Sequence, residues 1–469
     1  MTIHFIGICG TAMATLAALL KRRGHLVQGS DQAVYPPMSD FLAREGIRTF
    51  DGYRAEHITP GIDLVIVGNA ISRGNPELEA VLDAKCRYGS LPEAIRDEFL
   101  WDHRSIVIAG THGKTTTTAL AGWLLTHGGA DPTMLAGGIA ANFAASYRVG
   151  QGRDFVLEGD EYDSAWFDKT AKFLKYLPDV AVVGNVEFDH ADIYPDLDAV
   201  LLAFRRFVNL VPRRGLTIVG ADSPHAASLV ALARSRIQTF GIATAGADWR
   251  AVDVRPGDGG TAFSILHGGH AFADVRLPLL GDHNVRNALA AVAVAAEAGI
   301  TAPAIAAGLA SFRGVKRRME LRGVVRGISV YDDFAHHPTA IAETLAGARR
   351  ARPQARLWAI FEPRSATSCR RVFQEAFADA FAAADQTIVA AVFRWTLPEA
   401  DRLDVPALVA ALTARGVPAR HLPSTQAIVD TVAAEARDGD LIVVMSNGGF
   451  DGLHDRLLAA LGRDDVARP

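Results

Sequence analysis

The length, composition and charge of the chain exclude several classes of protein. Its 469 residues, of which 49% are hydrophobic and 21% charged, fit a globular protein of about three domains and exclude a disordered chain. Because 48 basic residues stand against 52 acidic ones, the formal net charge of −4 gives no reason to expect nucleic acid or an anionic membrane as a partner.

The cysteines, the apolar runs and the N-terminus all bear on the compartment in which we expect the protein. Cys9, Cys86 and Cys369 are too few and too far apart for a disulfide framework. No apolar run reaches the roughly 20 residues of a membrane span, and the N-terminus lacks the basic start of a signal peptide. We therefore expect a cytoplasmic protein with small-molecule partners, as a monomer or a weak homo-oligomer.

Short apolar runs alternate with alanine- and leucine-rich segments of helical length along the whole chain. The runs that we expect to be buried strands are Ile3–Ile6, Leu64–Val67, Ser105–Ala109, Phe155–Leu157, Val180–Val183, Leu216–Val219, Ile328–Tyr331, Leu357–Phe361, Thr387–Val392 and Leu441–Met445. Strands that alternate with helices predict parallel sheets with helices on both faces, so the fold class is α/β.

Two connectors divide this pattern into three expected domains. The charged segment Glu98–Arg104 precedes the second group of strands, and the basic segment Phe312–Arg322 has the composition of a hinge. We expect a Rossmann-like domain over residues 1–102, a central domain over 103–312 and a C-terminal α/β domain over 313–469.

The first strand leads into a glycine-containing loop, Gly7-Ile8-Cys9-Gly10-Thr11, and a helix. Such a loop can bind a pyrophosphate at the helix N-terminus. The dinucleotide pattern G-x-G-x-x-G needs glycine where Cys9 and Ala12 stand, so the match is partial. An NAD-dependent enzyme, with Asp31 on the ribose, stays an alternative at this point. Cys9 is either a reactive thiol or a small buried one.

The most specific signal is a phosphate loop in the second group of strands. The strand Ser105–Ala109 runs into Gly110-Thr111-His112-Gly113-Lys114-Thr115-Thr116, and a helix follows. Backbone N–H groups can approach phosphate here, Lys114 reaches the β- and γ-phosphates, and the Thr115 hydroxyl suits Mg²⁺. The first glycine stands two residues later than in the standard pattern, so the loop is a shortened variant.

Acidic residues and a histidine follow two neighbouring strands. Glu158-Gly159-Asp160-Glu161 follows one of them, and Asn185 and Glu187-Phe188-Asp189-His190 follow the next. Each acid alone could be a solvated strand end or a helix cap. Because ligands collect at the carboxyl ends of parallel strands, we interpret Thr115, Glu158 and His190 as Mg²⁺ ligands beside a triphosphate.

Together these motifs resemble those of the Mur ligase family, the ATP-dependent amide-forming enzymes of peptidoglycan assembly. The further matching motifs are Gly281-Asp282-His283-Asn284 with Asn287, Lys316-Arg317-Arg318-Met319-Glu320, and Asp332-Asp333-Phe334-Ala335-His336-His337-Pro338. They occur in family order over nearly the whole chain. The resemblance implies three domains: one for a UDP-sugar, a central ATPase, and a C-terminal domain that closes over ATP and the amino substrate.

The resemblance also implies ATP and Mg²⁺ as cofactors and a reaction through an acyl phosphate. The residues with implied catalytic roles are Lys114, Glu158, His190 and Arg318. The implied nucleotide contacts are Gly110, Thr111, His112, Gly113, Lys114, Thr115, Thr116, His283, Asn284, Asn287, Arg318, Asp333 and His336. The implied substrate contacts are Gly7, Cys9, Gly10, Thr11, Asp31, Asn69, Arg364, Ser446 and Asn447.

Two family members share the N-terminal loop and the Asp-Asp-x-x-His-His-Pro motif. One adds L-alanine to UDP-N-acetylmuramate, and the other adds the recycled tripeptide L-alanyl-γ-D-glutamyl-meso-diaminopimelate. The segments similar to the second include Tyr35-Pro36-Pro37-Met38-Ser39, Phe361-Glu362-Pro363-Arg364-Ser365 and Met445-Ser446-Asn447-Gly448-Gly449-Phe450. Arg205 stands where several members carry a carbamylated lysine, as expected for this branch. The tripeptide ligase is therefore implied, with the L-alanine ligase as the alternative.

Other interpretations stay open for single features. His283 and Asn287 share a helix face that suits adenine, but helix capping by Asp282 and Asn284 explains the motif as well. Arg364 is either the cation for a peptide carboxylate or a structural residue at a strand end. The adjacent histidines His336 and His337 could bind zinc. A non-catalytic nucleotide-binding protein is a further class of function.

Overall fold

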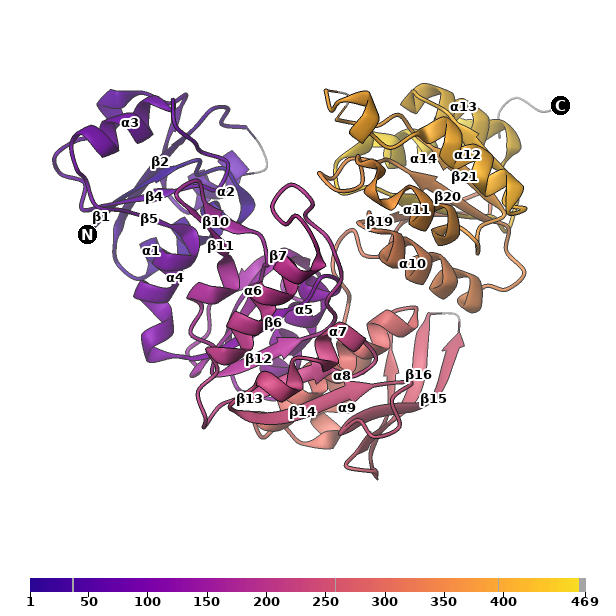
Figure 1. Cartoon of the computed structure of the whole chain (residues 1–469), viewed down its shortest axis with the longest axis horizontal. Helices are drawn as coiled ribbons and strands as arrows, with labels where there is room; N and C mark the ends of the chain where they lie inside the picture. The colour runs from indigo at the N-terminus through magenta and orange to yellow at the C-terminus, as the bar shows by residue number, and fades with distance from the viewer. Residues whose placement is uncertain (36–37, 258, 395, 464–469) are drawn as a thin grey trace. The chain divides into compact units, whose positions relative to one another are not determined.

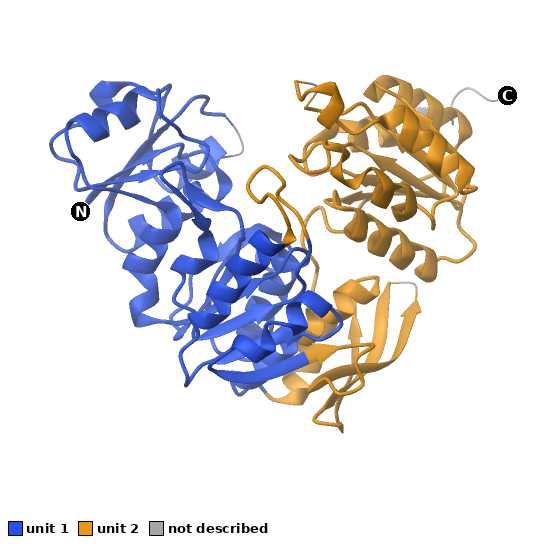
Figure 2. Cartoon of the chain, viewed as in Figure 1, with its two compact units in different colours: residues 1–187, 198–239, 290–300 blue, residues 188–197, 240–289, 301–469 orange. Residues whose placement is uncertain are grey.

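The computed structural model describes the chain apart from residues 36–37, 258, 395 and 464–469, so two residues of the Tyr35–Ser39 motif lie outside the described part. The chain forms two compact units. The first contains residues 1–187, 198–239 and 290–300, and the second contains residues 188–197, 240–289 and 301–469 (Figure 2).

The first unit opens with a five-stranded parallel sheet in the order β3-β2-β1-β4-β5. Its elements are β1 (Thr2–Ile6), α1 (Thr11–Arg22), β2 (Leu26–Asp31), α2 (Met38–Arg44), β3 (Arg48–Asp51), β4 (Leu64–Val67), α3 (Pro76–Asp83), β5 (Tyr88–Ser90) and α4 (Leu91–Phe99). The strand order changes direction at β1, because β2 and β3 lie on one side of it and β4 and β5 on the other. The loop after β1 therefore lies at the carboxyl edge of the sheet at the point where ligands bind in such folds.

A second sheet of this unit runs in the order β13-β12-β6-β9-β7-β8. Its elements are β6 (Arg104–Ala109), α5 (Lys114–His127), β7 (Thr133–Ala140), β8 (Ala145–Arg148), β9 (Asp154–Gly159), β12 (Val180–Val183), α6 (Leu197–Asn209), β13 (Leu216–Gly220) and α7 (Pro224–Ala227). Strand β6 pairs in parallel with β9 on one side and β12 on the other, with Ala109 level with Gly159 and Val183. The phosphate loop and both acidic motifs therefore begin at the same edge of this sheet, where β6, β9 and β12 end.

A hairpin of β10 (Asp163–Ala165) and β11 (Asp168–Ala171) separates β9 from β12. Trp166 and Phe167 at its tip pack against the apolar residues of the five-stranded sheet, among them Ile6 and Val65. The Phe167 ring meets Tyr88 edge-on, with centroids 5.1 Å apart. The sequence pattern did not predict this hairpin, because three or four residues per strand are too few for a visible alternation.

The second unit contains an antiparallel meander and a mixed sheet. The meander has the order β17-β16-β15 and consists of β15 (Trp249–Gly257), β16 (Gly260–His267) and β17 (His270–Leu277), whereas the end of β14 (Arg236–Gly241) pairs with β15 in parallel. We expected parallel pairing throughout, and the antiparallel pairs correct this. The helices α8 (Asp282–Glu297), which starts in this unit, and α9 (Ala302–Ala310) follow.

The C-terminal sheet has the order β18-β19-β23-β20-β21-β22, parallel except for β18. Its elements are β18 (Glu320–Val325), β19 (Ile328–Asp333), α10 (Pro338–Ala351), β20 (Leu357–Phe361), α11 (Gln374–Ala380), β21 (Gln386–Val389), α12 (Val405–Ala414), β22 (Ala419–His421), α13 (Thr425–Glu435), β23 (Leu441–Met445) and α14 (Leu453–Arg463). The expected strand Thr387–Val392 is too long, because its pairing with β22 ends at Val389.

Helices cover both faces of this sheet, as predicted (Figure 1). Leu357, Ala359 and Phe361 of β20 face a core with α10, α11 and α12, whereas Trp358 and Ile360 face a core with α13 and α14. Alternate residues of a strand point to opposite faces, so an unbroken apolar run is buried on both. Among the described helices, none is long and apolar enough to cross a membrane.

Candidate active site

The phosphate loop lies between β6 and α5 and depends on glycine at two positions. Gly110 has φ +141° and Gly113 has φ +80°, values that favour glycine. A Cβ at Gly110 would lie 3.2 Å from the Asn185 nitrogen, so a larger residue would crowd the backbone there as well as strain its own. Gly113 is the N-cap of α5 and supplies no side-chain acceptor. The first N–H groups of α5 are thus left for an anionic ligand.

Lys114 is held by acceptors within the first unit. Its Nζ donates to the Gly110 carbonyl at 2.9 Å and to Glu161 Oε2 at 2.7 Å. Burial alone would lower the pKa of Lys114, but Glu161, Asp160 and Glu158 raise it above its usual value. The side chain therefore stays a cation. The sequence motif contained Glu161 but gave no sign that it pairs with this lysine.

Thr115 and Glu158 come together, as the Mg²⁺ prediction requires. Thr115 Oγ1 donates to Glu158 Oε1 at 2.8 Å, and the Gly137 amide donates to the other carboxylate oxygen. Burial, and then the neighbouring Asp160, raise the pKa of Glu158 above its usual value. A hydroxyl and a carboxylate are hard oxygen donors of the kind Mg²⁺ prefers, so the pair fits the ion.

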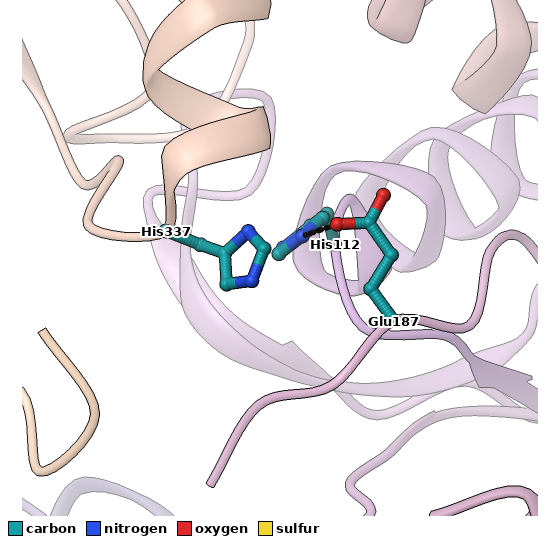
Figure 3. A group of neighbouring side chains, drawn as sticks. All are labelled: His112, Glu187 and His337. Atoms are coloured by element: carbon teal, nitrogen blue, oxygen red, sulfur yellow. Dashed lines mark hydrogen bonds and ion pairs between the residues drawn. The ribbon is translucent and has the colours of Figure 1, made fainter. Parts of the chain in front are cut away.

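The segment after β12 forms hydrogen bonds with the phosphate loop. The Asn185 side chain accepts from the His112 amide at 2.8 Å and donates to the His112 carbonyl at 3.2 Å. The Glu187 amide donates to Thr111 Oγ1 at 2.8 Å. Figure 3 shows the His112 ring with a nitrogen facing the Glu187 carboxylate, 3.4 Å away. Sequence reasoning assigned no role to Asn185, although its place directly after a buried strand was a signal.

The predicted UDP-sugar residues gather at the carboxyl edge of the five-stranded sheet. The Cys9 amide donates to Asp31 Oδ2 at 2.8 Å, and the Tyr53 hydroxyl lies 3.4 Å from Oδ1. Burial, followed by the Asp31 and Asp51 charges, raises the pKa of Cys9 to about 11. A raised pKa disfavours the thiolate, which is the nucleophilic form of a cysteine. Asn69 follows β4 and donates to Asp163 of the β10–β11 hairpin at 3.4 Å.

The remaining predicted substrate residues of this loop begin α1. Gly10 is the N-cap of α1, without a side-chain cap, and Thr11 is its first residue. Gly7 has φ +87° and donates its N–H to the Ser30 carbonyl. The loop therefore presents the N–H groups of a helix N-terminus beside Asp31.

In the second unit, His283, Asn284 and Asn287 form a chain of side-chain contacts at the start of α8. Asn284 Nδ2 lies 3.0 Å from His283 Nε2, and Asn287 Nδ2 donates to Asn284 Oδ1 at 3.3 Å. Among the described residues, no side chain or backbone group bonds the enclosed His283 Nδ1. Burial lowers the pKa of His283 to about 3, so its ring is neutral. Arg350 NH1 donates to Asp282 Oδ1 at 2.9 Å.

The hinge motif is tied to the Asp332–His337 motif. Met319 donates its N–H to Asp333 Oδ2 at 2.7 Å, and Ala335 donates to Oδ1 at 2.8 Å. The Arg318 guanidinium lies over the Phe334 ring, 4.8 Å from its centroid. Asp333 thus anchors the hinge, and the nucleotide roles of Asp333 and Arg318 stay predictions.

The two adjacent histidines contact different groups. His336 Nδ1 lies 3.0 Å from the Phe334 carbonyl, whereas His337 Nε2 lies 3.1 Å from the Phe188 carbonyl. His336 Nε2 is 3.9 Å from Asp189. The two rings thus contact different groups, and zinc binding by both histidines stays an alternative from the sequence.

The predicted peptide residues surround Glu362. Arg364 stacks on Phe393, 3.7 Å from the ring centroid, and its NH1 lies 3.4 Å from Glu362 Oε1. Ser446 Oγ donates to the other Glu362 oxygen. Asn447 Oδ1 is enclosed without a donor from the described part of the chain. Sequence reasoning missed Glu362 and Phe393, which approach Arg364 only through the fold.

Comparisons with known proteins match all three parts of the chain. Residues 2–98 match the Mur ligase family catalytic domain, residues 108–295 the Mur ligase middle domain, and residues 317–448 the Mur ligase glutamate ligase domain. These matches confirm the expected α/β class with three Mur ligase domains.

Curated relatives and solved structures cover the whole chain. The UDP-N-acetylmuramate–L-alanyl-γ-D-glutamyl-meso-2,6-diaminoheptandioate ligase of Escherichia coli is 40% identical over 466 residues, 99% of each chain. A UDP-N-acetylmuramate–L-alanine ligase of Chelativorans is 39% identical, over 96% of this chain and 95% of its own. The murein peptide ligase structure from Psychrobacter arcticus has a TM-score of 0.73 at 38% identity, covering 98% of this chain and 99% of its own. The chain therefore belongs to the Mur ligase family.

Proposed function

We propose that this protein is an ATP-dependent ligase that joins L-Ala-γ-D-Glu-meso-diaminopimelate to UDP-N-acetylmuramate in murein recycling. The observation that carries the proposal is the 40% identity, over nearly the full length, to ligases of Escherichia coli and Haemophilus influenzae named for this substrate pair. The domain boundaries proposed with it are 1–102, 103–312 and 313–469.

The chemistry requires two anions, a carboxylate and a triphosphate, to meet. The muramate carboxylate oxygen bonds to the γ-phosphorus as ADP leaves, and the peptide amine then displaces phosphate from the acyl phosphate. Lys114 lies at the loop that would hold the triphosphate, and its charge would offset the repulsion once Glu161 yields it to phosphate. Mg²⁺, when bound at Thr115 and Glu158, supplies further positive charge.

The remaining roles are assigned on the second unit. His190 is proposed as a ligand of a second Mg²⁺ and Arg318 as the γ-phosphate cation. The enclosed Nδ1 of His283 supports a contact to adenine, because it is an acceptor or donor still without a partner in the described structure. The proposed nucleotide contacts there are His283, Asn284, Asn287, Arg318, Asp333 and His336.

For the tripeptide, we assign Arg364 to a carboxylate and Ser446 and Asn447 to polar groups. The Phe393 face holds the Arg364 guanidinium in one plane, which suits bidentate recognition of a carboxylate. The enclosed Asn447 Oδ1 suits a ligand N–H. Cytoplasmic localisation, and a monomer or weak homo-oligomer, belong to the same proposal.

A second candidate is the L-alanine ligase, favoured by relatives of nearly equal identity. ADP release and the muropeptide product, measured with UDP-N-acetylmuramate and either amine substrate, separate the two. We expect turnover with the tripeptide and none with L-alanine, and Lys114→Ala should release no ADP with either. Turnover with L-alanine alone would overturn the proposal in favour of the second candidate.

A further inference from the structure

The segment that carries His190 is attached to the C-terminal domain. Residues 188–197 belong to the second unit, although they follow directly on β12 of the first (Figure 2). Two of the hydrogen bonds in the described structure that hold this segment join its backbone to side chains of the C-terminal domain. Thr367 Oγ1 accepts from the Ala191 amide at 3.2 Å, and His337 Nε2 lies 3.1 Å from the Phe188 carbonyl.

The two bonds fix the chain before and after His190, at Phe188 and at Ala191. Between them the backbone turns sharply: the amides of Ile193 and Tyr194 both donate to the His190 carbonyl, at 2.8 and 2.9 Å. His190 itself has φ +53°, in the left-handed region that a non-glycine residue seldom adopts. Such a conformation persists only where the surroundings over-determine it.

The direction of the His337 bond follows from its other nitrogen. His337 is the N-cap of α10, and its Nδ1 accepts from the Thr339 amide at 3.3 Å. The proton of the neutral ring must therefore sit on Nε2, which donates to the Phe188 carbonyl. His337 is 5% exposed and Thr367 is 3% exposed, so both bonds are shielded from water.

The two anchors come from motifs with different proposed ligands. His337 is next to His336 in the proposed nucleotide motif, and Thr367 lies three residues beyond Arg364 in the proposed peptide loop. Phe373 adds an apolar contact, with its ring 6.1 Å from Phe188 and 4.7 Å from His337. One backbone segment is thus held by two parts of the C-terminal domain that would respond to substrates.

We propose that Thr367 and His337 are positioning residues that fix the backbone of His190, so that the C-terminal domain carries this metal ligand. The inference rests on the proposed function, in which His190 binds the second Mg²⁺. The affinity of His190 for the second ion then depends on the Thr367 and His337 bonds.

Three variants of the full-length protein test the role of the Thr367 bond. Thr367→Val keeps the shape and removes the acceptor, whereas Thr367→Ser keeps the hydroxyl. Thr413→Val on α12 is the matched control, since its Oγ1 bonds only the Val409 carbonyl of its own helix in the described structure. His337→Asn retains a good N-cap for α10 but is too short for the Phe188 carbonyl.

The first measurement is hydrogen exchange of residues 188–197. We expect Thr367→Val and His337→Asn to raise exchange at the Ala191 amide and its neighbours up to about tenfold, because one hydrogen bond is lost. Thr367→Ser and Thr413→Val should match the parent protein. Unchanged exchange in both Thr367→Val and His337→Asn would overturn the inference.

The second measurement is Mn²⁺ binding by electron paramagnetic resonance with a non-hydrolysable ATP analogue present. We expect the weaker of two ions to lose about tenfold in affinity in Thr367→Val, while the tighter ion and the analogue bind as before. Excess Mg²⁺ should restore kcat. One bound ion in the parent, or unchanged affinity for both ions in Thr367→Val, would overturn the inference.

The same experiments separate the inference from the proposed function. If the parent binds two ions and Thr367→Val loses the weaker one, the inference holds even if neither amine substrate is ligated, and only the proposed substrates fall. If the parent ligates the tripeptide but Thr367→Val binds both ions normally, the inference falls and the proposed function stands.

Discussion

At the scale of residues, Lys114 and Glu161 place two opposite charges side by side in a buried position. The two side chains are 11% and 2% exposed and lie 2.7 Å apart. A buried pair of this kind contributes little over apolar packing, but loss of one partner leaves an unpaired buried charge. Lys114 can therefore bind phosphate only if another cation, such as a bound metal ion, compensates the negative charge of the acidic side chains around it.

This pair predicts a non-additive result in a double-mutant cycle. We expect Lys114→Met to lower the free energy of unfolding by about 3 kcal/mol, because Glu161 is left buried without its cation. Lys114→Met with Glu161→Gln should recover a large part of that loss. Urea unfolding followed by circular dichroism measures both values. Equal stability of the single and double variants would contradict the role given to Glu161.

Arg364 depends on the absence of a side chain at Gly448. A Cβ there would lie 2.0 Å from the Arg364 Nε, whereas a Cβ at the neighbouring Gly449 would meet nothing within 4 Å. We expect Gly448→Ala to raise the KM for the tripeptide at least tenfold, since a displacement of about 1 Å costs up to about a hundredfold in rate. Steady-state kinetics should show an unchanged KM for ATP.

Gly449→Ala is the matched control and should behave as the parent protein. If Gly448→Ala had the parent's KM for the tripeptide, Arg364 would not be a peptide contact.

At the scale of elements, the β10–β11 hairpin links β9 to the five-stranded sheet. It follows β9, which carries Glu158, and places Trp166 and Phe167 against the core of the five-stranded sheet. Asp163 in the same hairpin contacts Asn69. A short hairpin thus connects the segment after β9 to the loop after β4 within the first unit.

Truncation at the hairpin tip is expected to loosen that link. Trp166→Ala should lower the free energy of unfolding by about 2 kcal/mol, as large-to-small changes in packed sites do, and raise the KM for UDP-N-acetylmuramate. Trp101, which is 68% exposed, supplies the control. Trp101→Ala should change stability by less than about 0.5 kcal/mol. Equal unfolding curves for the two variants would contradict the role of the hairpin.

At the scale of the whole molecule, a near-neutral net charge coexists with strongly anionic proposed substrates. The cations proposed to meet these substrates lie on three separate segments: Lys114 at the phosphate loop, Arg318 at the hinge and Arg364 after β20. Local placement of this kind needs no broad basic surface. Burial also changes how the whole molecule responds to pH.

His283 makes the stability of the fold depend on pH. Its pKa is about 3 in the folded state and about 6.5 when the chain is unfolded, so below pH 6.5 only the unfolded chain takes up the proton. The contribution of His283 to the free energy of unfolding is fully present above pH 6.5 and is lost as the pH falls from 6.5 toward 3. Between pH 7.5 and 5.5, the parent should lose up to about 1.4 kcal/mol more than His283→Gln in urea unfolding. Parallel pH curves would contradict the buried neutral state.

The sequence alone determined the fold class, the strands with long apolar runs and the phosphate loop. Leu64–Val67, Val180–Val183, Leu357–Phe361 and Leu441–Met445 lie where predicted, because strands buried on both faces consist of unbroken apolar residues. The loop was visible because a strand, glycines, Lys114, Thr115 and a helix must follow one another in the chain to bind phosphate.

Only the tertiary structure decided which distant residues meet. Glu161 beside Lys114, Phe393 under Arg364, and Thr367 on Ala191 are contacts between segments far apart in sequence. The antiparallel meander and the β10–β11 hairpin were missed because their short or half-exposed strands carry little apolar pattern. Local composition encodes an element's own burial and turns, whereas partners across the fold depend on how the elements pack together.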